Sequence, residues 1–511
     1  MKLTGMAQNI TTGITTNTRQ ILVLVLILAL LALPQIIPVL YVQHLAIMIF
    51  MYVALASSWN IIGGYAGYES FGHIVFFGIG AYTSALLLVR LGWSPFLTAP
   101  LAGLVACLFA LIALPSLRTR GAYFAITTLA LAMVGQLLIY NLDSITNGGR
   151  GLFLPLPSLD IRMSKLPFYY AMLLGATGTV ALSYLIKHSK FGLGLELIRD
   201  DEDKAQAVGI NTTLYKCLAF LMSAFFPGYV GAIYAYYINY ISPASTFSIL
   251  ISINILLFAI FGGKGTVVGP VLGAAILIPI SQFLNIMLTT EFHVLLFGLL
   301  LMAVVMYLPS GLVSLVNRFP ARRVAIKPQS PPGQLVPDSS LGPPSVLAKN
   351  KIAPLRGSDV LLSVQEVTKR FGGVVALDQC SFEVHRGTVT GLIGPNGSGK
   401  STVINVITGA CRADAGTLTY RGRPYHGLRP YQIKTMGIAR SFQETRVFSS
   451  LTVLENVLAS VSARSGLDLL QSRLTPAEVD RALELLAFVG LAHLSAVQAN
   501  ELSYGQQKLL E

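Results

Sequence analysis

The apolar residues of this chain are distributed very unevenly between its two ends. Hydrophobic residues make up 53% of the sequence and charged residues only 12%, and the mean hydropathy is +0.65. The apolar residues concentrate before Pro309, in runs as long as the roughly 20 residues that a helix needs to cross a bilayer core. This part of the chain therefore predicts a bundle of membrane helices, whereas the part after Pro309 has the composition of a water-soluble domain.

The apolar runs predict about ten membrane-spanning helices. Their expected ranges are 20–41, 44–63, 71–90, 96–116, 121–141, 168–187, 215–238, 248–262, 268–289 and 293–309. Most Lys and Arg residues between these runs fall on one side of the membrane, and basic loops stay in the cytoplasm. We therefore expect both termini to be cytoplasmic.

Small residues and one histidine inside the apolar part suggest how its helices pack. Gly63 and Gly67 are four residues apart, as are Gly265, Gly269 and Gly273. Such spacing lets helix backbones approach closely in lipid. His73 lies within a predicted span, and we interpret it as a packing histidine or a helix cap.

The formal net charge of +13 does not indicate nucleic-acid binding. The basic residues are spread over membrane-flanking loops and a linker, so no nucleic-acid partner is expected. The four cysteines have no CxxC spacing, which argues against metal and disulfide roles.

The stretch from 321 to 360 is rich in proline and glycine. This composition suits a flexible linker. We therefore predict a membrane domain over 1–320, a linker over 321–360 and a second domain over 361–511. Alternating apolar and polar residues predict strands at 361–367 and 374–384, and a short apolar strand is expected at 388–393.

The sequence from 394 to 401 reads Gly-Pro-Asn-Gly-Ser-Gly-Lys-Ser, a complete GxxxxGK[ST] phosphate-binding loop. Its glycines let backbone N–H groups approach the phosphates of a nucleotide, and the following helix directs its positive end toward them. Lys400 would reach the β- and γ-phosphates of ATP, and the Ser401 hydroxyl would ligate Mg²⁺. The candidate nucleotide-binding residues of this loop are Gly394, Pro395, Asn396, Gly397, Ser398, Gly399, Lys400, Ser401 and Thr402.

Two later stretches add to this site. Residues 441–444 place Gln443 in a turn that follows an apolar run, and residues 502–507 read Leu-Ser-Tyr-Gly-Gln-Gln. The second stretch predicts a helix start with Ser503 as N-cap and Gln506 at the third helical position. A helix start that bears Ser and Gly is also an anion site.

Together these motifs resemble the ATP-binding cassette (ABC) ATPases, and the membrane part resembles the permeases of the branched-chain amino-acid importer family. In the cassette part, the resemblance is carried by residues 371–373, 394–401, 440–443, 446–448, 451–456 and 502–507. In the membrane part, it is carried by residues 59–73, 76–82, 118–123, 146–149, 199–202, 207–209 and 261–263. The fold that this implies is a membrane all-α permease followed by an incomplete α/β P-loop ATPase domain.

The resemblance implies roles for individual residues. Phe371 matches the aromatic residue that stacks on adenine, although a core phenylalanine at a strand end is an alternative. Gln443 matches the glutamine that senses Mg²⁺ and the γ-phosphate. Ser503, Gly505 and Gln506 match signature residues that close over ATP held by the opposite subunit. The stretch 196–216 resembles the helix that couples permease to ATPase, and a solvated loop is its alternative.

The resemblance also implies an activity and partners. The chain is expected to be the permease and ATP-binding subunit of an ATP-driven importer for branched-chain or related amino acids, in a bacterial inner membrane. Its partners would be membrane lipid, a second permease subunit, a second ABC ATPase subunit and a periplasmic substrate-binding protein. Its cofactors would be ATP and Mg²⁺. One alternative is an importer of urea or short amides, and another is a non-hydrolysing ATP-sensing regulatory membrane protein.

No catalytic residue is predicted within the chain. In the resembling family, an Asp for Mg²⁺, a Glu that activates water and a switch histidine follow the signature helix, and their positions would lie beyond Glu511. We therefore expect the chain to be a fragment of a longer fused product that does not hydrolyse ATP unaided.

Overall fold

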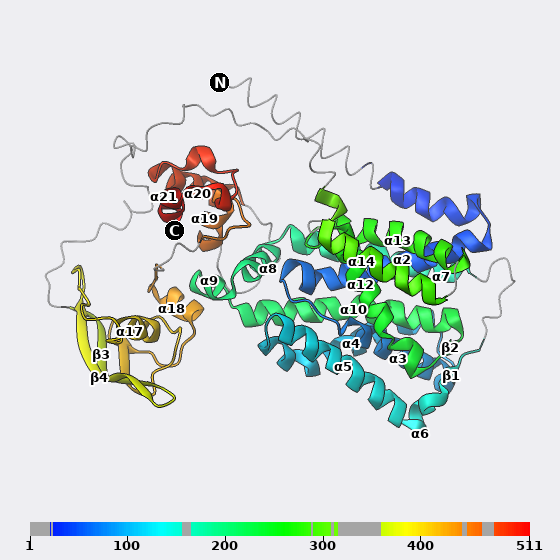
Figure 1. Cartoon of the computed structure of the whole chain (residues 1–511), viewed down its shortest axis with the longest axis horizontal. Coiled ribbons are helices and arrows are strands. Elements are labelled where there is room, and N and C mark those ends of the chain that lie inside the picture. Colours follow the sequence, from blue (N-terminus) through cyan, green and yellow to red (C-terminus); the bar gives the residue numbers. More distant parts are fainter. Residues whose placement is uncertain are drawn as a thin grey trace, which may run out of the picture. The chain divides into compact units, whose positions relative to one another are not determined.

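The computed structural model describes residues 21, 24–155, 165–287, 290–307, 311–314, 359–441, 447–461 and 475–511 (Figure 1). The chain forms two compact units. The first comprises Met1–Lys187 and Cys217–Ala321, and the second comprises His188–Lys216 and Arg322–Glu511. The predicted linker, 321–360, lies outside the described residues except for its last two positions. The segment 188–216, which the predicted membrane domain includes, groups with the C-terminal residues.

The first unit is a bundle of long helices. They are α2 (Leu40–Asn60), α3 (His73–Leu91), α4 (Pro95–Ala113), α5 (Ala122–Asn141), α7 (Leu166–Lys187), α10 (Thr212–Ile238), α12 (Ile249–Gly262), α13 (Val268–Met287) and α14 (Thr290–Tyr307). In the described part of the chain, eight helical stretches are long and apolar enough to cross a membrane, and each overlaps a predicted span. The two other predicted spans overlap the shorter helix Leu24–Ile36 and α14.

Short elements connect these helices. A π-helical turn, η1 (Ile61–Tyr65), extends α2, and the 3-10 turn η2 (Leu114–Arg118) follows α4. Between α5 and α7 lie α6 (Asp143–Thr146), η3 (Gly148–Arg150) and β1 (Leu152–Phe153). β1 pairs with β2 (Tyr240–Ile241), which precedes α11 (Pro243–Thr246).

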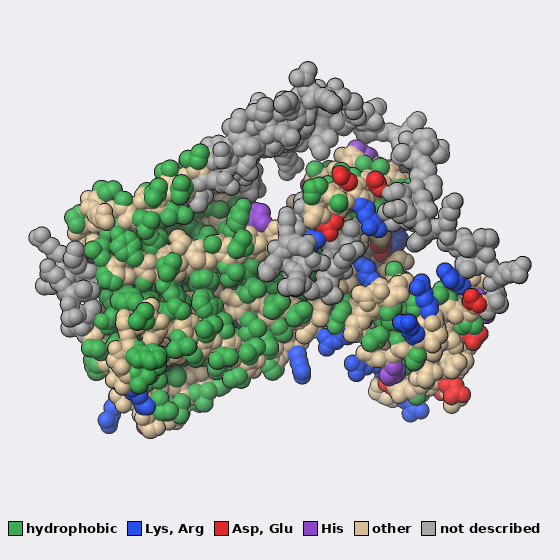
Figure 2. All heavy atoms as spheres, turned by 180° about the vertical axis from the view of Figure 1, so that it is seen from behind, with side chains coloured by type: hydrophobic (Ala, Val, Ile, Leu, Met, Phe, Trp, Pro, Cys, Tyr) green, Lys and Arg blue, Asp and Glu red, His purple; other side chains and the backbone are tan. Residues whose placement is uncertain are grey.

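The surface and the core of this unit follow the composition of a membrane domain. Hydrophobic side chains cover most of the face of this unit that Figure 2 shows. Leu97, Ile112 and Tyr123 are each more than 70% exposed. In a bilayer these side chains would contact lipid tails. In the core, α2 is the most completely buried span, and its Trp59 side chain donates a hydrogen bond to the Ser70 carbonyl (2.7 Å).

Of the glycines whose spacing predicts close helix packing, Gly269 and Gly273 lie at close contacts, whereas Gly67 and Gly265 lie outside helices with φ angles of 76° and 78°. A Cβ atom on Gly273 of α13 would lie 1.9 Å from the Phe258 carbonyl oxygen of α12, and one on Gly269 would lie 2.2 Å from the Gly263 carbonyl oxygen. His73 is buried at the start of α3, and its Nε2 atom lies 3.2 Å from Ser223 Oγ. Its ring also packs against Phe76 and Phe220, which agrees with the predicted packing role, but its buried Nδ1 atom has no hydrogen-bond partner among the described residues.

The second unit contains a four-stranded antiparallel sheet in the order β4-β3-β5-β6. Its strands are β3 (Val360–Phe371), β4 (Val374–His385), β5 (Ala415–Tyr420) and β6 (Arg423–Pro424). The helices of the unit are α8 (Lys190–Asp200), α9 (Glu202–Ala207), α17 (Lys400–Ile407), α18 (Pro430–Met436), α19 (Val453–Val461), α20 (Pro476–Phe488) and α21 (Tyr504–Leu510). Two short 3-10 turns, η5 (Ala492–Leu494) and η6 (Ala499–Glu501), precede α21.

Two hydrophobic clusters organise the C-terminal part of this unit. In the first, Val364 and Val367 of β3 pack with Val403 and Val406 of α17. The second cluster joins α19 and α20 to the residues before α21 and includes Val453, Leu486, Leu491 and Leu502. The phosphate-loop region therefore packs on the sheet, whereas the last helix belongs to a separate helical cluster.

The strands predicted at 361–367 and 374–384 are confirmed as parts of β3 and β4, but the strand predicted at 388–393 is wrong. Residues 388–393 form no strand, and Val389 and Ile393 are almost fully exposed. A strand forms only where a neighbour satisfies its backbone hydrogen bonds. Among the described residues, no segment pairs with this one.

Candidate nucleotide-binding site

The phosphate loop adopts a conformation that its glycines make possible. Gly397 and Gly399 have φ angles of 85° and 87°, in the left-handed region that favours glycine. A Cβ atom on Gly399 would lie 2.5 Å from the Ala376 carbonyl oxygen of β4, whereas one on Gly397 would meet no atom within 4 Å. The loop therefore fits tightly against the sheet at Gly399 and is open around Gly397.

Lys400 begins α17 and folds back over the loop. Its Nζ atom donates hydrogen bonds to the carbonyl oxygens of Gly394 (2.8 Å) and Pro395 (2.6 Å) and lies 3.4 Å from Ser398 Oγ. The loop residues 394–398 are exposed. An ammonium group held at the centre of an exposed loop at a helix start is the arrangement that binds phosphate oxygens.

Ser401 and Thr402 lie in the first turn of α17, and the Ser401 side chain is exposed. A hydroxyl oxygen at this place fits Mg²⁺, a hard cation that binds oxygen and completes its shell with phosphate oxygens and water. The chain thus offers one ligand here, and the nucleotide would supply others.

Phe371 is not a core residue. It ends β3 beside Gly372, whose φ angle is 57°, and 53% of its surface is exposed. The Lys369 ammonium lies 5.3 Å from the centroid of its ring. An exposed ring at a hairpin tip is available to stack on a base, so the core alternative is excluded by the structure.

The start of α21 has the predicted geometry. Ser503 is the N-cap, and its Oγ atom accepts a hydrogen bond from the Gln506 backbone N–H (3.4 Å). The Gln506 side chain accepts in turn from the Ser503 backbone N–H (3.0 Å). The two hydrogen bonds form a reciprocal capping box. The space around the Gly505 Cα atom is unoccupied, because a Cβ atom added there would meet no atom within 4 Å. The predicted positions of Ser503 and Gln506 are confirmed, whereas the predicted site residue Gln443 lies outside the described residues.

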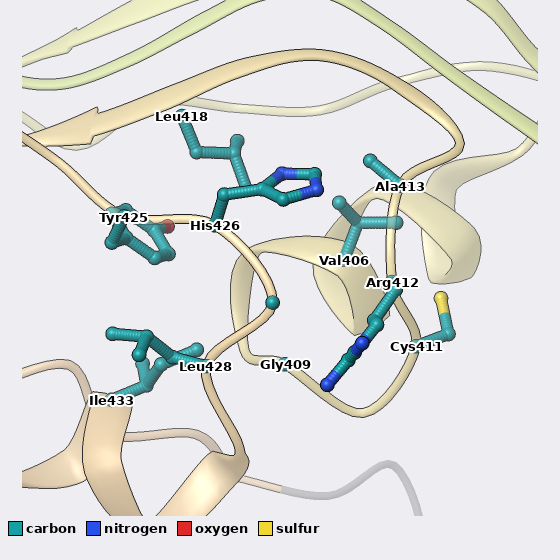
Figure 3. Close-up of a pocket in the computed structure, with 11 residues that line it drawn as sticks. Val406, Gly409, Cys411, Arg412, Ala413, Leu418, Tyr425, His426, Leu428 and Ile433 are labelled. Atoms are coloured by element: carbon teal, nitrogen blue, oxygen red, sulfur yellow. The ribbon is translucent and has the colours of Figure 1, made fainter.

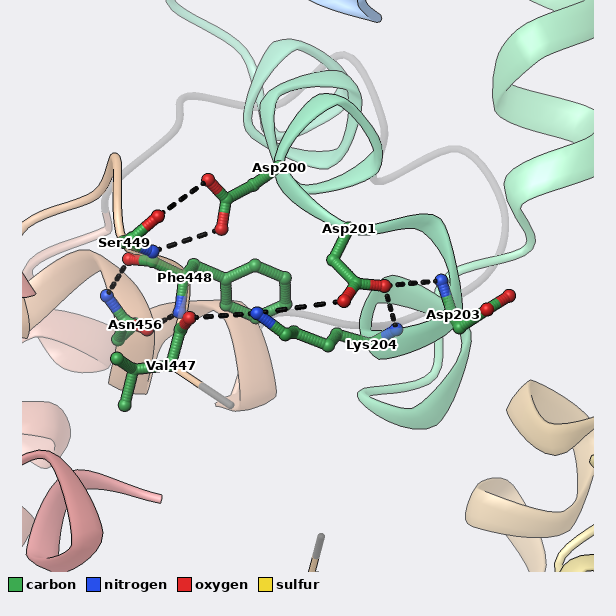
Figure 4. A network of polar contacts seen from close by, with 8 residues as sticks. All are labelled: Asp200, Asp201, Asp203, Lys204, Val447, Phe448, Ser449 and Asn456. Atoms are coloured by element: carbon green, nitrogen blue, oxygen red, sulfur yellow. Dashed lines mark hydrogen bonds and ion pairs between the residues drawn. The ribbon is translucent and has the colours of Figure 1, made fainter. Parts of the chain in front are cut away.

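A second feature of this unit is the contact of residues 188–216, which we call the docking segment, with the C-terminal residues. Figure 4 shows that the Asp200 carboxylate accepts hydrogen bonds from the backbone N–H (3.0 Å) and hydroxyl (3.2 Å) of Ser449. Lys204 donates to the Val447 carbonyl oxygen (3.1 Å) and lies 5.9 Å from the centroid of the Phe448 ring. The solvated-loop alternative for residues 196–216 is therefore wrong.

Further contacts extend along the docking segment. Lys190 forms an ion pair with Glu478 of α20 (2.8 Å), and Arg429 donates to the Thr213 hydroxyl (2.7 Å). Lys434 of α18 donates to the Val208 carbonyl oxygen, just after α9, and to the Ser460 carbonyl oxygen near the end of α19 (3.3 Å). Burial lowers the pKa of Lys434.

No sequence motif marks Lys190, Arg429, Lys434 or Glu478 as contact residues. The contacting residues are as much as 288 positions apart, and no local pattern connects them. One weak signal was available for Glu478, because Thr475 three residues earlier suggests a helix start with a charged residue in its first turn.

A separate shallow hollow lies near the C-terminal end of α17 (Figure 3). Its lining includes Cys411, Arg412, Tyr425 and His426 but none of the predicted nucleotide-binding residues. Burial chiefly raises the pKa of the Cys411 thiol, and burial and Tyr420 raise the pKa of Tyr425 to about 12. Both groups are therefore neutral near pH 7, which is typical of packing residues.

Residues 41–305, more than half of the chain, match the family model described as the branched-chain amino acid transport system permease component. The chain belongs to this family. Residues 377–511 match the ABC transporter family. This is therefore a multi-pass membrane protein that carries an ABC transporter domain on the same polypeptide, and that domain implies nucleotide binding.

Individual relatives agree with both matches. The high-affinity branched-chain amino acid transport ATP-binding protein LivG of Salmonella typhimurium is 40% identical over 162 residues, which are 30% of this chain and 64% of the relative. The permease protein LivM of the same organism is 29% identical over 301 residues, 53% of this chain and 70% of the relative. This chain therefore spans less than two thirds of the length of LivG.

A relative from another organism and a solved structure have similar sequence identity and coverage. The probable LivG of Methanocaldococcus jannaschii is 40% identical over 163 residues, 31% of this chain and 63% of the relative. A crystal structure of a nucleotide-free ATP-binding cassette from an ABC transporter is 39% identical and covers 30% of this chain and 62% of its own, with a TM-score of 0.27.

Proposed function

We propose that this chain is the permease and ATP-binding subunit of an ATP-driven importer for branched-chain or related amino acids. The observation that carries the proposal is the union of the two family matches on one polypeptide, with a phosphate loop whose lysine lies over exposed loop carbonyls. LivG and LivM are named for branched-chain amino acid transport, which supports this class of cargo.

In the proposed site, each residue has a separate task. Backbone N–H groups of 394–399 and the start of α17 bind the phosphates of ATP, and Lys400 leaves its two carbonyl partners to pair with them. Ser401 and Gln443 hold Mg²⁺, and Phe371 stacks on adenine. When bound, ATP supplies the phosphate groups whose binding and release drive the conformational cycle.

The proposal includes a dimeric arrangement. Ser503, Gly505 and Gln506 of one cassette would close over ATP held by the phosphate loop of a second ABC ATPase subunit. A second permease subunit would complete the translocation path, and a periplasmic substrate-binding protein would deliver cargo. The docking segment would carry motion between cassette and membrane helices, because its ends continue into α7 and α10.

The proposed location is a bacterial inner membrane with both termini in the cytoplasm, where ATP is available.

The proposed division of the chain into domains is a permease domain over 1–320, a linker over 321–360 and a cassette over 361–511. The family matches at 41–305 and 377–511 support this division because each falls within one proposed domain.

Nucleotide binding is the first step to test. Photolabelling of membranes that contain the chain with an azido analogue of ATP should label the wild type, and Lys400→Ala should reduce the labelling at least tenfold. The matched control is Arg423→Ala, because Arg423 is an exposed cation of β6 outside the phosphate loop. Equal labelling of Lys400→Ala and wild type would contradict the proposed site.

A further inference from the structure

A row of polar side chains runs between α2, α10 and α12 of the membrane unit. At one end, the Nδ1 atom of His44 lies 2.6 Å from the Tyr237 hydroxyl, and the two rings stack with their centroids 5.8 Å apart. Tyr234, three residues before Tyr237, lies close enough to Tyr237 and Tyr52 for their hydroxyls to interact electrostatically. The Tyr52 hydroxyl interacts in turn with the Asn254 side chain of α12. We call these five residues the polar row.

The polar row reaches the middle of the membrane helices. Tyr52 lies 12 residues beyond Leu40, the first residue of α2, which is about 18 Å along the helix. Asn254 lies near the middle of the span Pro243–Gly262. Tyrosines that anchor a helix at the membrane–water interface lie near its ends. Interfacial anchoring therefore does not explain the inner part of the row.

The side chains of the polar row remain partly accessible. All five residues are half-buried, although α2 is the most completely buried of the spans. Hydroxyl and amide groups lose favourable hydrogen bonds to water when they face hydrocarbon, and polar residues in membrane helices face the bundle interior or a water-filled cavity. The accessible part of the row therefore fits contact with water better than contact with lipid tails.

Neighbouring aromatic rings hold the two central tyrosines. The Phe77 ring packs against Tyr234 with the centroids 5.3 Å apart, and the Phe258 ring meets Tyr52 edge to face with the centroids 5.0 Å apart. Rings that are fixed in this way keep their hydroxyls in place before a ligand arrives, which reduces the entropy that binding costs.

The polar row has the chemistry of a weak site for a small zwitterion. Tyrosine hydroxyls and the Asn254 amide both donate and accept hydrogen bonds, so they can pair with a carboxylate and with an ammonium group. The tyrosine faces can contact an ammonium group or an apolar side chain. The row contains no Asp, Glu, Lys or Arg, and uncharged partners bind a ligand weakly enough to let it move on.

Two oxygen atoms near the His44 end of the row have no hydrogen-bond partner among the described residues. They are Oε1 of Gln43, the residue before His44, and Oδ1 of Asn239, two residues after Tyr237, and both atoms are buried. Buried polar atoms without a partner are rare in folded proteins. An ammonium group supplies the N–H donors that such oxygens accept.

We propose that the polar row lines a water-filled path in the membrane unit and contacts the ammonium and carboxylate groups of an amino acid in transit. The inference rests on the proposed transport function and states which side chains the cargo meets inside the membrane. It assigns a hydrogen-bonding role to the tyrosine hydroxyls beyond the packing of their rings.

Reaction of single cysteines with a water-soluble thiol reagent tests the proposal. Tyr52→Cys, Tyr234→Cys and Asn254→Cys would each be placed in the full chain with its four native cysteines replaced by serine, and membranes would be treated with a methanethiosulfonate that carries a fixed ammonium charge. The matched control is Leu108→Cys, since Leu108 is exposed near the middle of the span Pro95–Arg118. We expect the row cysteines to react at least tenfold faster than Leu108→Cys, because the reagent and the reactive thiolate both require water. An excess of leucine should slow them at least threefold.

The outcomes are distinct. Labelling of the row as slow as that of Leu108→Cys would overturn the proposal, because it would place the row against lipid or against another subunit. Rapid labelling that leucine does not slow would overturn the contact with the amino acid. Asn254→Cys gives the same readout if Tyr52→Cys does not reach the membrane. Wild-type cells that take up no branched-chain amino acid, although leucine protects the row, would contradict the proposed function alone.

Removal of one hydroxyl tests the hydrogen-bonding role. Tyr52→Phe retains the ring, and in the Asn254→Cys chain we expect it to raise the leucine concentration for half-maximal protection at least threefold. Tyr123→Phe is the matched control, because Tyr123 is an exposed tyrosine of α5, and it should leave this concentration unchanged. An unchanged concentration in the Tyr52→Phe chain would overturn the contact between this hydroxyl and the ligand.

Discussion

The Asn60 side chain accepts a hydrogen bond from the Gly265 backbone N–H over 2.8 Å. Its amide nitrogen also donates to the Thr266 carbonyl oxygen over 2.8 Å. These bonds connect the end of α2, where it passes into the π-helical turn η1, to the loop between α12 and α13. One buried side chain thus satisfies two backbone groups of a distant loop.

Replacement of this side chain should destabilise the membrane unit. Asn60→Ala removes both hydrogen bonds and leaves the Gly265 N–H group buried without its partner, which costs about 2 to 3 kcal/mol. Asn141→Ala is the control, because Asn141 is exposed and its side chain donates to the Leu137 carbonyl oxygen of its own helix. Thermal unfolding in detergent should show a clearly lower midpoint temperature for Asn60→Ala and little change in the midpoint for Asn141→Ala. Equal midpoints for the two variants would contradict the role of the Asn60 hydrogen bonds.

Two glycines allow a matched test of helix packing. Gly273→Ala forces a methyl group against the Phe258 carbonyl oxygen, and we expect it to destabilise the bundle by about 1 to 3 kcal/mol. Gly298→Ala in α14 meets no atom within 4 Å, so its effect should be neutral or slightly stabilising. The thermal midpoints of the two variants give the comparison. Equal effects would mean that α12 and α13 are not in close contact.

The Lys190–Glu478 pair should make stability depend on pH. Burial alone would raise the pKa of Glu478, but the hydrogen bonds from Lys190 and Thr475 outweigh it and hold the pKa below 4.5. A carboxylate with a depressed folded-state pKa stabilises the protein above its unfolded-state pKa, and this stabilisation is lost as the pH falls through the folded-state pKa.

We therefore expect the free energy of unfolding of the wild type to exceed that of Glu478→Gln by about 1 kcal/mol near pH 7. The difference should shrink as the pH falls below 4.5. Thermal unfolding of both proteins between pH 7 and about pH 3.5 measures it. A difference that stays constant over this range would show that the Glu478 charge is not the source of the stabilisation.

The capping box of α21 predicts a local effect. Ser503→Ala removes the acceptor for the Gln506 N–H group and should cost about 1 kcal/mol of helix stability. Hydrogen exchange of residues 504–510 should therefore accelerate roughly fivefold. Ser503→Asp retains a capping oxygen and should keep exchange slow. Fast exchange in both variants would indicate that capping does not stabilise this helix.

The sequence predicted the features that depend on local patterns. Apolar runs gave the membrane helices because the bilayer sets their length and composition. Strands β3 and β4 followed from alternating apolar and polar residues, although their antiparallel pairing was not predicted. Ser503 was recognisable as a cap because its partner Gln506 is only three residues away.

Features that depend on distant contacts were not predictable in this way. Residues 388–393 have strand composition, but whether they form a strand depends on a neighbouring segment that the local sequence does not specify. The contacts of Lys190 with Glu478 and of Lys434 with Val208 join residues that are 288 and 226 positions apart. The π-helical turn after Asn60 likewise has no simple local pattern, since its residues are ordinary helix formers and glycines.

The central claim is that nucleotide binding at Lys400 drives amino-acid import through the permease on the same chain. The direct measurement is uptake of radiolabelled leucine, isoleucine, valine and urea by cells whose own gene carries Lys400→Ala, compared with Arg423→Ala and wild type. The account predicts that Lys400→Ala abolishes uptake of branched-chain amino acids, while urea uptake and the Arg423→Ala cells remain normal. Unchanged amino-acid uptake in the Lys400→Ala cells would contradict it.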